Sequence, residues 1–224
     1  MKIKASSADT LIIYFSNKIE EQTSLKVMRA YNNLLDLHLE GIFEIIPSYT
    51  SIYIHYDILF YDFLLLKQIL EEKLDLNSAL ENNSKFINID VYYGLDVGFD
   101  LEQISKKTAI SIDEIIKIHS SKIYNVYAIG FLPGFAYLGN VSKKIDISRL
   151  DTPRKIVPKG SVAIANSQTA VYPQDSPGGW NIIGKTTYNF FNKDLKNLSN
   201  IKVGDKIKFN PISKDEFLKQ KGVI

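Results

Sequence analysis

The sequence predicts an α+β protein with an N-terminal domain of mixed helices and strands and a C-terminal domain of strands. Three observations support this prediction. Strand-like and helix-like stretches alternate up to about residue 93, two short helical stretches follow, and helical periodicity largely stops after Tyr124. Short apolar runs between Gly, Pro and Asn then replace it, which is typical of a β-barrel or a β-sandwich. We therefore expect domains over 1–93 and 124–224, joined by a helical connector over 94–123.

The elements of the N-terminal domain are predicted from hydrophobic periodicity. Apolar side chains recur at every second residue in a half-buried strand and at every third or fourth residue in an amphipathic helix. By these rules we expect strands at 10–15, 42–47, 51–57 and 85–94, and helices at 24–39 and 63–74. The resulting order, β-α-β-β-α-β, is that of a ferredoxin-like domain.

The connector has the spacing of a helix-turn-helix. Two short helices are expected near 101–107 and 112–119, and Ser111 with Glu114 forms a capping-box pattern before the second. Binding to DNA is one interpretation. The second helix, however, carries an apolar stripe, two acidic residues and one lysine, which is a poor surface for the major groove. We therefore predict a structural connector.

Composition excludes several classes of function. The 27 basic and 25 acidic residues give a net charge of +2, whereas nucleic-acid binding needs clustered cations. The absence of cysteine excludes disulfides, thiolate catalysis and cysteine-based metal sites. No apolar run approaches the roughly 18 residues of a membrane span, and the start of the chain has no secretory apolar region. We expect a cytoplasmic protein that binds neither nucleic acid nor membrane.

No metal site is expected from the histidines. His38, His55 and His119 lack the paired spacing of zinc ligands. His119 lies on the apolar stripe of the second connector helix. It is therefore either a buried, hydrogen-bonded residue or a residue that faces the mouth of a barrel.

Candidate ligand-binding residues come from three stretches of the C-terminal domain that mix aromatic and polar side chains. The stretches are GFLPGFAYLG (130–139), TPRKIVPKGSVAIANSQTAVYP (152–173) and SPGGWNIIGKT (176–186). Aromatic walls with a few polar groups are typical of small-ligand sites. Together with His119, the candidates are Phe135, Tyr137, Arg154, Gln168, Thr169, Tyr172, Ser176 and Trp180. Each has a structural alternative: a packed turn for the first stretch, a solvated charge or turn residues for the second, and a core tryptophan for the third.

In this order, the three stretches resemble the KipI / allophanate-hydrolase-subunit-1 family, which also comprises the B subunits of prokaryotic 5-oxoprolinase. The final stretch VGDKIKFNPI (203–212) is similar to the last strand of that family, and the resemblance covers essentially the whole chain. The chain departs from the family pattern at GLDVGFD (94–100), at Ala136 and at Asn166-Ser167. The resemblance implies a ferredoxin-like domain followed by a cyclophilin-like β-barrel.

The resemblance also implies a function. It predicts one component of a heteromeric, ATP-dependent 5-oxoprolinase that opens 5-oxoproline to glutamate. The partners would be a homologous larger subunit (C type) and a third, hydrolase subunit (A type), with ATP and Mg held by the complex. This chain would be inactive alone, and no catalytic residue is assigned. Two alternatives stay open: an inhibitor of a sporulation-type histidine kinase, and a subunit that degrades allophanate or urea, because related domains form the carboxyltransferase part of urea carboxylase.

Site roles follow from the same expectation. Arg154 would hold a carboxylate or a phosphate, because a guanidinium pairs with either through two parallel hydrogen bonds. Gln168, Thr169 and Ser176 would bind the lactam by hydrogen bonds. Phe135, Tyr172 and Trp180 would form the apolar walls.

Overall fold

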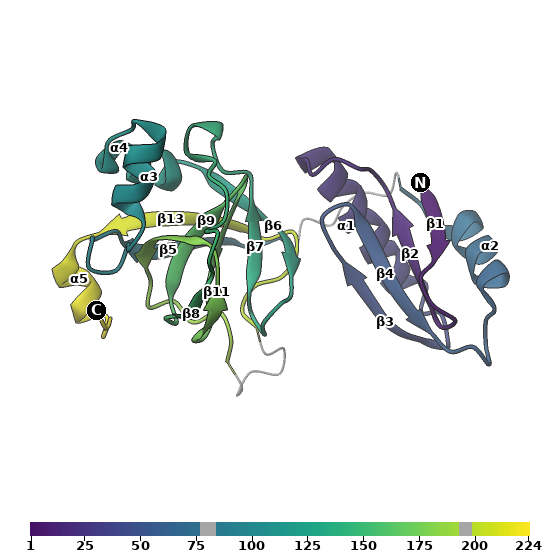
Figure 1. Ribbon diagram of the computed structural model, residues 1–224. Helices are drawn as coiled ribbons and strands as arrows, with labels where there is room; N and C mark the ends of the chain where they lie inside the picture. The colour runs from purple at the N-terminus through teal and green to yellow at the C-terminus, as the bar shows by residue number, and fades with distance from the viewer. Residues whose placement is uncertain (77–83, 193–198) are drawn as a thin grey trace. The chain divides into compact units, whose positions relative to one another are not determined.

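The computed structural model describes residues 1–76, 84–192 and 199–224. The chain divides into two compact units, Met1–Asn83 and Ser84–Ile224, called here the N-terminal and C-terminal units. Figure 1 labels most of the helices and strands of both units.

The N-terminal unit is an antiparallel sheet packed against two helices. Its strands lie in the order β1-β2-β4-β3. Their bounds are β1 (Lys2–Ala5), β2 (Thr10–Tyr14), β3 (Ile42–Pro47) and β4 (Ser51–Tyr56), and the helices are α1 (Glu21–Asp36) and α2 (Phe63–Lys73). One face of the sheet supplies alternate residues such as Leu11, Ile13, Ile52 and Ile54 to the core, which α1 and α2 complete.

The prediction that residues 85–94 complete this sheet is wrong. Strand β5 (Phe86–Tyr92) lies in the C-terminal unit, where it pairs in parallel with β13 (Lys206–Ile212) over seven residue pairs. The edge beside β2 is occupied by β1, which the periodicity did not reveal because it is only four residues long. Alternating apolar residues show that a segment is a strand, but they do not show which sheet it joins.

The C-terminal unit is a closed barrel, which confirms the predicted α+β class with a β-barrel in this half. Its strand order is β10-β7-β6-β13-β5-β12-β9. The strands not yet located are β6 (Ile123–Ile129), β7 (Ala136–Gly139), β9 (Ser161–Ala165), β10 (Gln168–Val171) and β12 (Asn181–Lys185). A two-stranded ribbon is formed by β8 (Arg154–Val157) and β11 (Ser176–Gly178). The remaining elements are α3 (Leu101–Thr108), α4 (Ile112–Ser120), the 3-10 helix η1 (Lys143–Ile145) and α5 (Lys214–Lys219).

The two predicted connector helices form as α3 and α4, and they pack on the barrel. Leu101, Ile104 and Ile115 are fully buried in the barrel's main core. The Ser111 hydroxyl accepts the Glu114 N–H at 3.3 Å and caps α4. Both helices therefore present their apolar faces to protein.

The barrel wall has two buried faces. On β9 and β10, Val162, Ile164 and Val171 belong to the main core inside the barrel. The residues that alternate with them, including Ala163 and Ala170, belong to a second apolar cluster on the outer face. Because strand side chains point alternately to opposite sides, one short strand serves both cores.

Across the described residues, none of the helices combines the length and the apolar character that a membrane crossing requires.

Removing β5 is expected to open the barrel. Its Ile89 and Val91 are fully buried in the main core, and the strand lies between β12 and β13. A chain of residues 84–224 should unfold cooperatively on heating, as followed by circular dichroism. A chain of residues 93–224 should show no cooperative transition, and an equal transition in both chains would contradict this role of β5.

Candidate functional site

A group of four aromatic residues lies on the outer face of the barrel wall. The Phe135 ring is central: its centroid is 4.9 Å from that of Tyr137, 5.3 Å from that of Tyr172 and 5.8 Å from that of Trp180. Tyr137 is half-buried and the other three are buried. These four residues, called here the aromatic cluster, were all predicted as site candidates, and the structure brings them together.

Small residues on the barrel strands make room for these rings. Ala163 and Ala165 on β9 and Ala170 on β10 point to the outer face and are almost completely buried. Methyl side chains leave space above the wall, so rings from neighbouring segments lie directly on it. The pattern of alanines alternating with large apolar residues in SVAIA therefore indicates one face that packs tightly inside and one that accommodates aromatic rings.

Two glycines make room for the cluster. In the turn before Phe135, Gly134 has φ +82°, and a Cβ atom there would lie 2.9 Å from the Phe190 carbonyl oxygen, so only glycine fits without strain. Pro177 and Gly178, predicted as part of a turn, lie instead in strand β11, where a Cβ atom at Gly178 would collide with the Tyr172 hydroxyl. Because these two positions have no side chain, the backbone there can approach its neighbours closely enough for the rings to pack together.

The Arg154 guanidinium is already paired within the protein. Its Nη2 donates to Asp100 Oδ1 at 2.8 Å, and the other carboxylate oxygen of Asp100 accepts the Ile182 N–H at 2.6 Å. Asp100 is 2 % exposed. One buried carboxylate therefore ties the start of α3 to β8 and to β12, and it neutralises the charge that the sequence analysis assigned to ligand binding.

Among the described residues of the C-terminal unit, several buried polar atoms have no hydrogen-bond partner. They are Arg154 Nη1, Gln168 Nε2, Ser176 Oγ and Asn181 Oδ1. Buried polar groups are nearly always hydrogen-bonded, so each such exception needs an explanation. The first three belong to predicted site residues, and two of them are N–H donors. The set suits an acceptor-rich, anionic ligand better than a cation.

His119 and Thr169 lie on the other side of the wall, away from the aromatic cluster. His119 Nε2 is 2.9 Å from Thr169 Oγ1, which donates to the Ala163 carbonyl at 3.0 Å, and Tyr93 Oη is 2.8 Å from His119 Nδ1. Since Thr169 donates its proton elsewhere, His119 Nε2–H donates to it and Tyr93 donates to Nδ1. Both residues are fully buried. The structure thus favours the buried, hydrogen-bonded alternative for His119.

Burial also fixes the charge state of His119. Desolvation lowers its pKa to about 3, because a buried imidazolium loses its hydration without gaining a counter-charge. The ring stacks on Phe209, with centroids 4.8 Å apart. His119 is therefore a neutral core residue at physiological pH.

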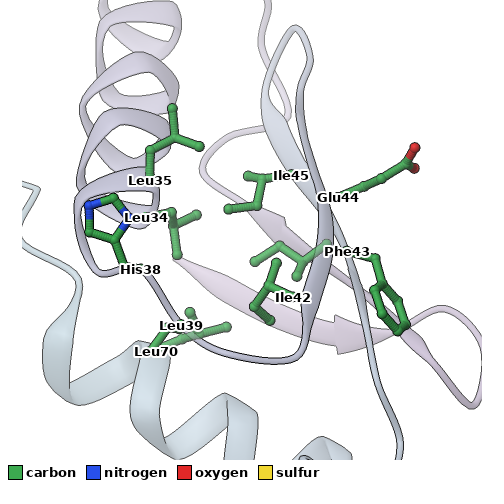
Figure 2. Close-up of a pocket in the computed structure, with 10 residues that line it drawn as sticks. Leu34, Leu35, His38, Leu39, Ile42, Phe43, Glu44, Ile45 and Leu70 are labelled. Atoms are coloured by element: carbon green, nitrogen blue, oxygen red, sulfur yellow. The ribbon is translucent and has the colours of Figure 1, made fainter.

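A pocket of about 220 Å³ lies elsewhere, in the N-terminal unit between α1, α2 and β3. Figure 2 shows Leu34, Ile42 and Ile45 pointing into it, whereas the Glu44 carboxylate points away. Ligand sites combine apolar walls with a few convergent polar groups. Apart from His38 and the outward-pointing Glu44, the residues that line this pocket are apolar, so we place the candidate site at the aromatic cluster and not at this pocket.

Two charged residues of the site, Asp100 and Arg149, were not among the predicted candidates. The Arg149 guanidinium carbon lies 5.7 Å from the centroid of the Trp180 ring. A signal was present in the composition: the chain has three arginines, and two of them, Arg149 and Arg154, stand five positions apart. Arginine is the cation best suited to bidentate and stacked contacts, so its concentration there in a lysine-rich chain indicates a specific role.

Comparison with known proteins agrees with the motifs. A family model described as "Carboxyltransferase domain, subdomain C and D" matches residues 1–200. The chain is 35% identical to the B subunit of 5-oxoprolinase from Bacillus subtilis over 96% of this chain and 95% of that protein. It is 37% identical to the B subunit of 5-oxoprolinase from Haemophilus influenzae over 76% of this chain and 79% of that protein.

One solved structure has the same fold over most of the chain. TTHA0988 is 26% identical with a TM-score of 0.82, and the match covers 92% of this chain but 40% of TTHA0988. The chain therefore spans less than half the length of that protein.

Releasing Arg154 from its buried partner is expected to destabilise the C-terminal unit. Asp100→Asn keeps an oxygen for the Ile182 N–H but leaves the guanidinium without a counter-charge, which should lower the free energy of unfolding by roughly 2 kcal/mol. Urea denaturation measures this value. The matched control is Asp96→Asn, which breaks an exposed pair with Lys214 at 2.7 Å and should change little. Equal free energies of unfolding for the two variants would contradict a stabilising role of the Asp100–Arg154 pair.

The His119 pKa predicts an acid-sensitive stability. Between its ordinary value of 6.5 and about 3, the unfolded chain binds a proton that the folded chain does not. Stability contributed by the neutral ring is thus complete above pH 6.5 and falls as pH decreases, by up to about 1.4 kcal/mol per pH unit. In His119→Gln the free energy of unfolding should fall less steeply between pH 6.5 and 4. Parallel pH profiles for the two proteins would refute the assignment.

Proposed function

This chain belongs to the carboxyltransferase domain, subdomain C and D, family, and from that premise we propose that it is one component of a heteromeric, ATP-dependent 5-oxoprolinase. The relative from Bacillus subtilis carries the proposal, because the match extends over nearly the whole length of both chains. The name of that relative as one subunit implies further subunits. We propose a homologous larger subunit of the C type and a third, hydrolase subunit of the A type as partners.

The proposed reaction opens the lactam of 5-oxoproline to give glutamate. An amide carbonyl is a poor electrophile. Transfer of the terminal phosphoryl group of ATP to the amide oxygen releases ADP and makes the ring carbon electrophilic. One water molecule then adds to that carbon and the C–N bond breaks, which leaves an acyl phosphate on the opened chain. A second water molecule hydrolyses the acyl phosphate to glutamate and phosphate, so that one ATP and two water molecules are consumed for each glutamate formed.

The aromatic cluster supplies the apolar walls for this substrate. Phe135, Tyr172 and Trp180 are almost completely buried and pack together, and they would form the apolar wall behind a five-membered lactam. The unpartnered donors of Arg154 and Gln168, with the Ser176 hydroxyl, are the groups that would bind its oxygens. Thr169 is withdrawn from the predicted set, because its hydroxyl is bonded to His119 and Ala163.

The donor set of this chain also bears on ATP and Mg. Phosphate oxygens suit N–H donors, whereas Mg²⁺ requires oxygen ligands, usually from carboxylates. Among residues 1–76, 84–192 and 199–224, no group of three or more His, Cys, Asp or Glu side chains gathers that could hold a metal ion. We propose that Mg enters with ATP and is held by the partner subunits, so that activity depends on the complex. We also propose a cytoplasmic location.

The structural names implied by the family resemblance belong to the same proposal. The sheet order β1-β2-β4-β3 with two helices is compatible with a ferredoxin-like arrangement in which β1 takes the edge place expected for a last strand. The seven-stranded barrel is compatible with a cyclophilin-like domain. Neither the kinase inhibitor nor the allophanate- or urea-degrading protein gains comparable support, because both relatives described above bear the oxoprolinase name.

Reconstitution with candidate partner subunits tests the function. The complete complex should hydrolyse ATP only when 5-oxoproline is present, and omission of this chain should abolish that activity. Trp180→Ala should reduce turnover at least about tenfold while the complex stays assembled, because one wall of the site is lost. Phe99→Ala, which removes an exposed ring (51 %) outside the cluster, is the control. Full 5-oxoproline-dependent turnover without this chain would overturn the proposal.

A further inference from the structure

We propose that Arg149 binds the anionic group of the ligand at the aromatic cluster, an inference that rests on the proposed function. The sequence analysis gave this role to Arg154. The structure places Arg149, an exposed residue, over the Trp180 ring at 5.7 Å from guanidinium carbon to centroid. Three features of the surroundings carry the assignment: the fixed position of Arg149, its uncompensated charge and the chemistry of its donors.

The backbone on both sides holds Arg149 against Trp180. The Ser148 carbonyl accepts a hydrogen bond from Asn181 Nδ2 at 2.8 Å, and the Leu150 N–H donates to the Gly179 carbonyl at 2.7 Å. Segments 148–150 and 179–181 are therefore tied immediately before and after the Arg149–Trp180 contact. Asn181 is fully buried, so this tie is part of the barrel and not a chance contact of two surface side chains.

The charge of Arg149, unlike that of Arg154, is not cancelled by an ion pair. Arg154 pairs with Asp100 at 2.8 Å, whereas the ion pairs found in the described part of the chain do not include Arg149. Its charge acts on the cluster: burial raises the pKa of Tyr137 and of Tyr172, and Arg149 opposes that rise at both. Arg149 therefore contributes positive charge at two of the four aromatic rings, whereas Arg154 acts on Tyr172 alone.

The chemistry of a guanidinium defines the ligand group. Its planar set of N–H donors matches the two oxygens of a carboxylate or a phosphate, and a cation–π contact with Trp180 leaves donors free to bind them. The proposed reaction offers two such groups, the carboxylate of 5-oxoproline and the phosphates of ATP. The shared feature is an oxyanion next to an apolar body, which the ring surfaces would cover.

Fluorescence of the single tryptophan tests binding directly in the full chain. We would titrate 5-oxoproline and, separately, ATP into wild type, Arg149→Gln and Lys144→Gln. The last variant removes one positive charge from the exposed 3-10 helix nearby in the chain and is the matched control. Wild type and the control should respond saturably to one of the two anions. Arg149→Gln should bind it at least about tenfold more weakly, the loss of one charge-assisted contact.

Steady-state kinetics of the reconstituted complex distinguish the two sources of the anion. Arg149→Gln should raise KM for 5-oxoproline if the carboxylate is bound, or KM for ATP if a phosphate is bound, with kcat changing less. Arg149→Lys should recover part of the affinity, because it restores the charge but not the planar donor set. Wild-type KM values for both substrates in Arg149→Gln, or a wild-type chain whose fluorescence responds to neither anion, would overturn the proposal. A wild-type complex without 5-oxoproline-dependent turnover would instead contradict the proposed function. The fluorescence titrations would still test anion binding by Arg149 in that case.

Discussion

The pairing of β5 with β13 is the constraint on which the C-terminal unit depends. The two strands come from opposite ends of that unit and run parallel over seven residue pairs. Parallel neighbours need a long crossover connection, and here the connection contains the helices α3 and α4 and the rest of the barrel. Closing the sheet in this way leaves no free edge and encloses the main core. The same wall carries a second cluster of buried side chains on its outer face.

The wall then separates two kinds of chemistry by strand alternation. Gln168 and Thr169 are neighbours in sequence, yet Thr169 joins the hydrogen-bonded chain with His119 inside the barrel, whereas residues of the opposite parity on the same strands contribute to the outer cluster. On the inner face, Tyr93, His119 and Thr169 are hydrogen-bonded to one another, and burial keeps His119 uncharged. Arg154 and Gln168 instead carry unpartnered donors. A ligand that needs polar contacts therefore finds donors at Arg154 and Gln168 and not at His119.

Asp100 links this outer face to the rest of the unit. Its carboxylate binds Arg154 and the backbone of Ile182, the second residue after Trp180, while segment 148–150 is tied to the residues on either side of that tryptophan. A buried charge is costly unless it is paired, and here both partners are supplied. The two arginines therefore differ in role: Arg154 is held in an ion pair within the protein, whereas Arg149 remains available to a ligand.

The sequence by itself determined the element types, the barrel in the second half, the family and all four members of the aromatic cluster. These features can be predicted because hydrophobic periodicity, turn glycines and the order of the motifs are properties of the linear sequence. It did not determine that β5 leaves the N-terminal sheet, since alternation identifies a strand without identifying its partners. Nor did it reveal that Arg154 is neutralised by Asp100, or that His119 and Thr169 face each other. Those facts join residues that are about 50 positions apart, and only the closing of the barrel brings them into contact and decides which charge stays free.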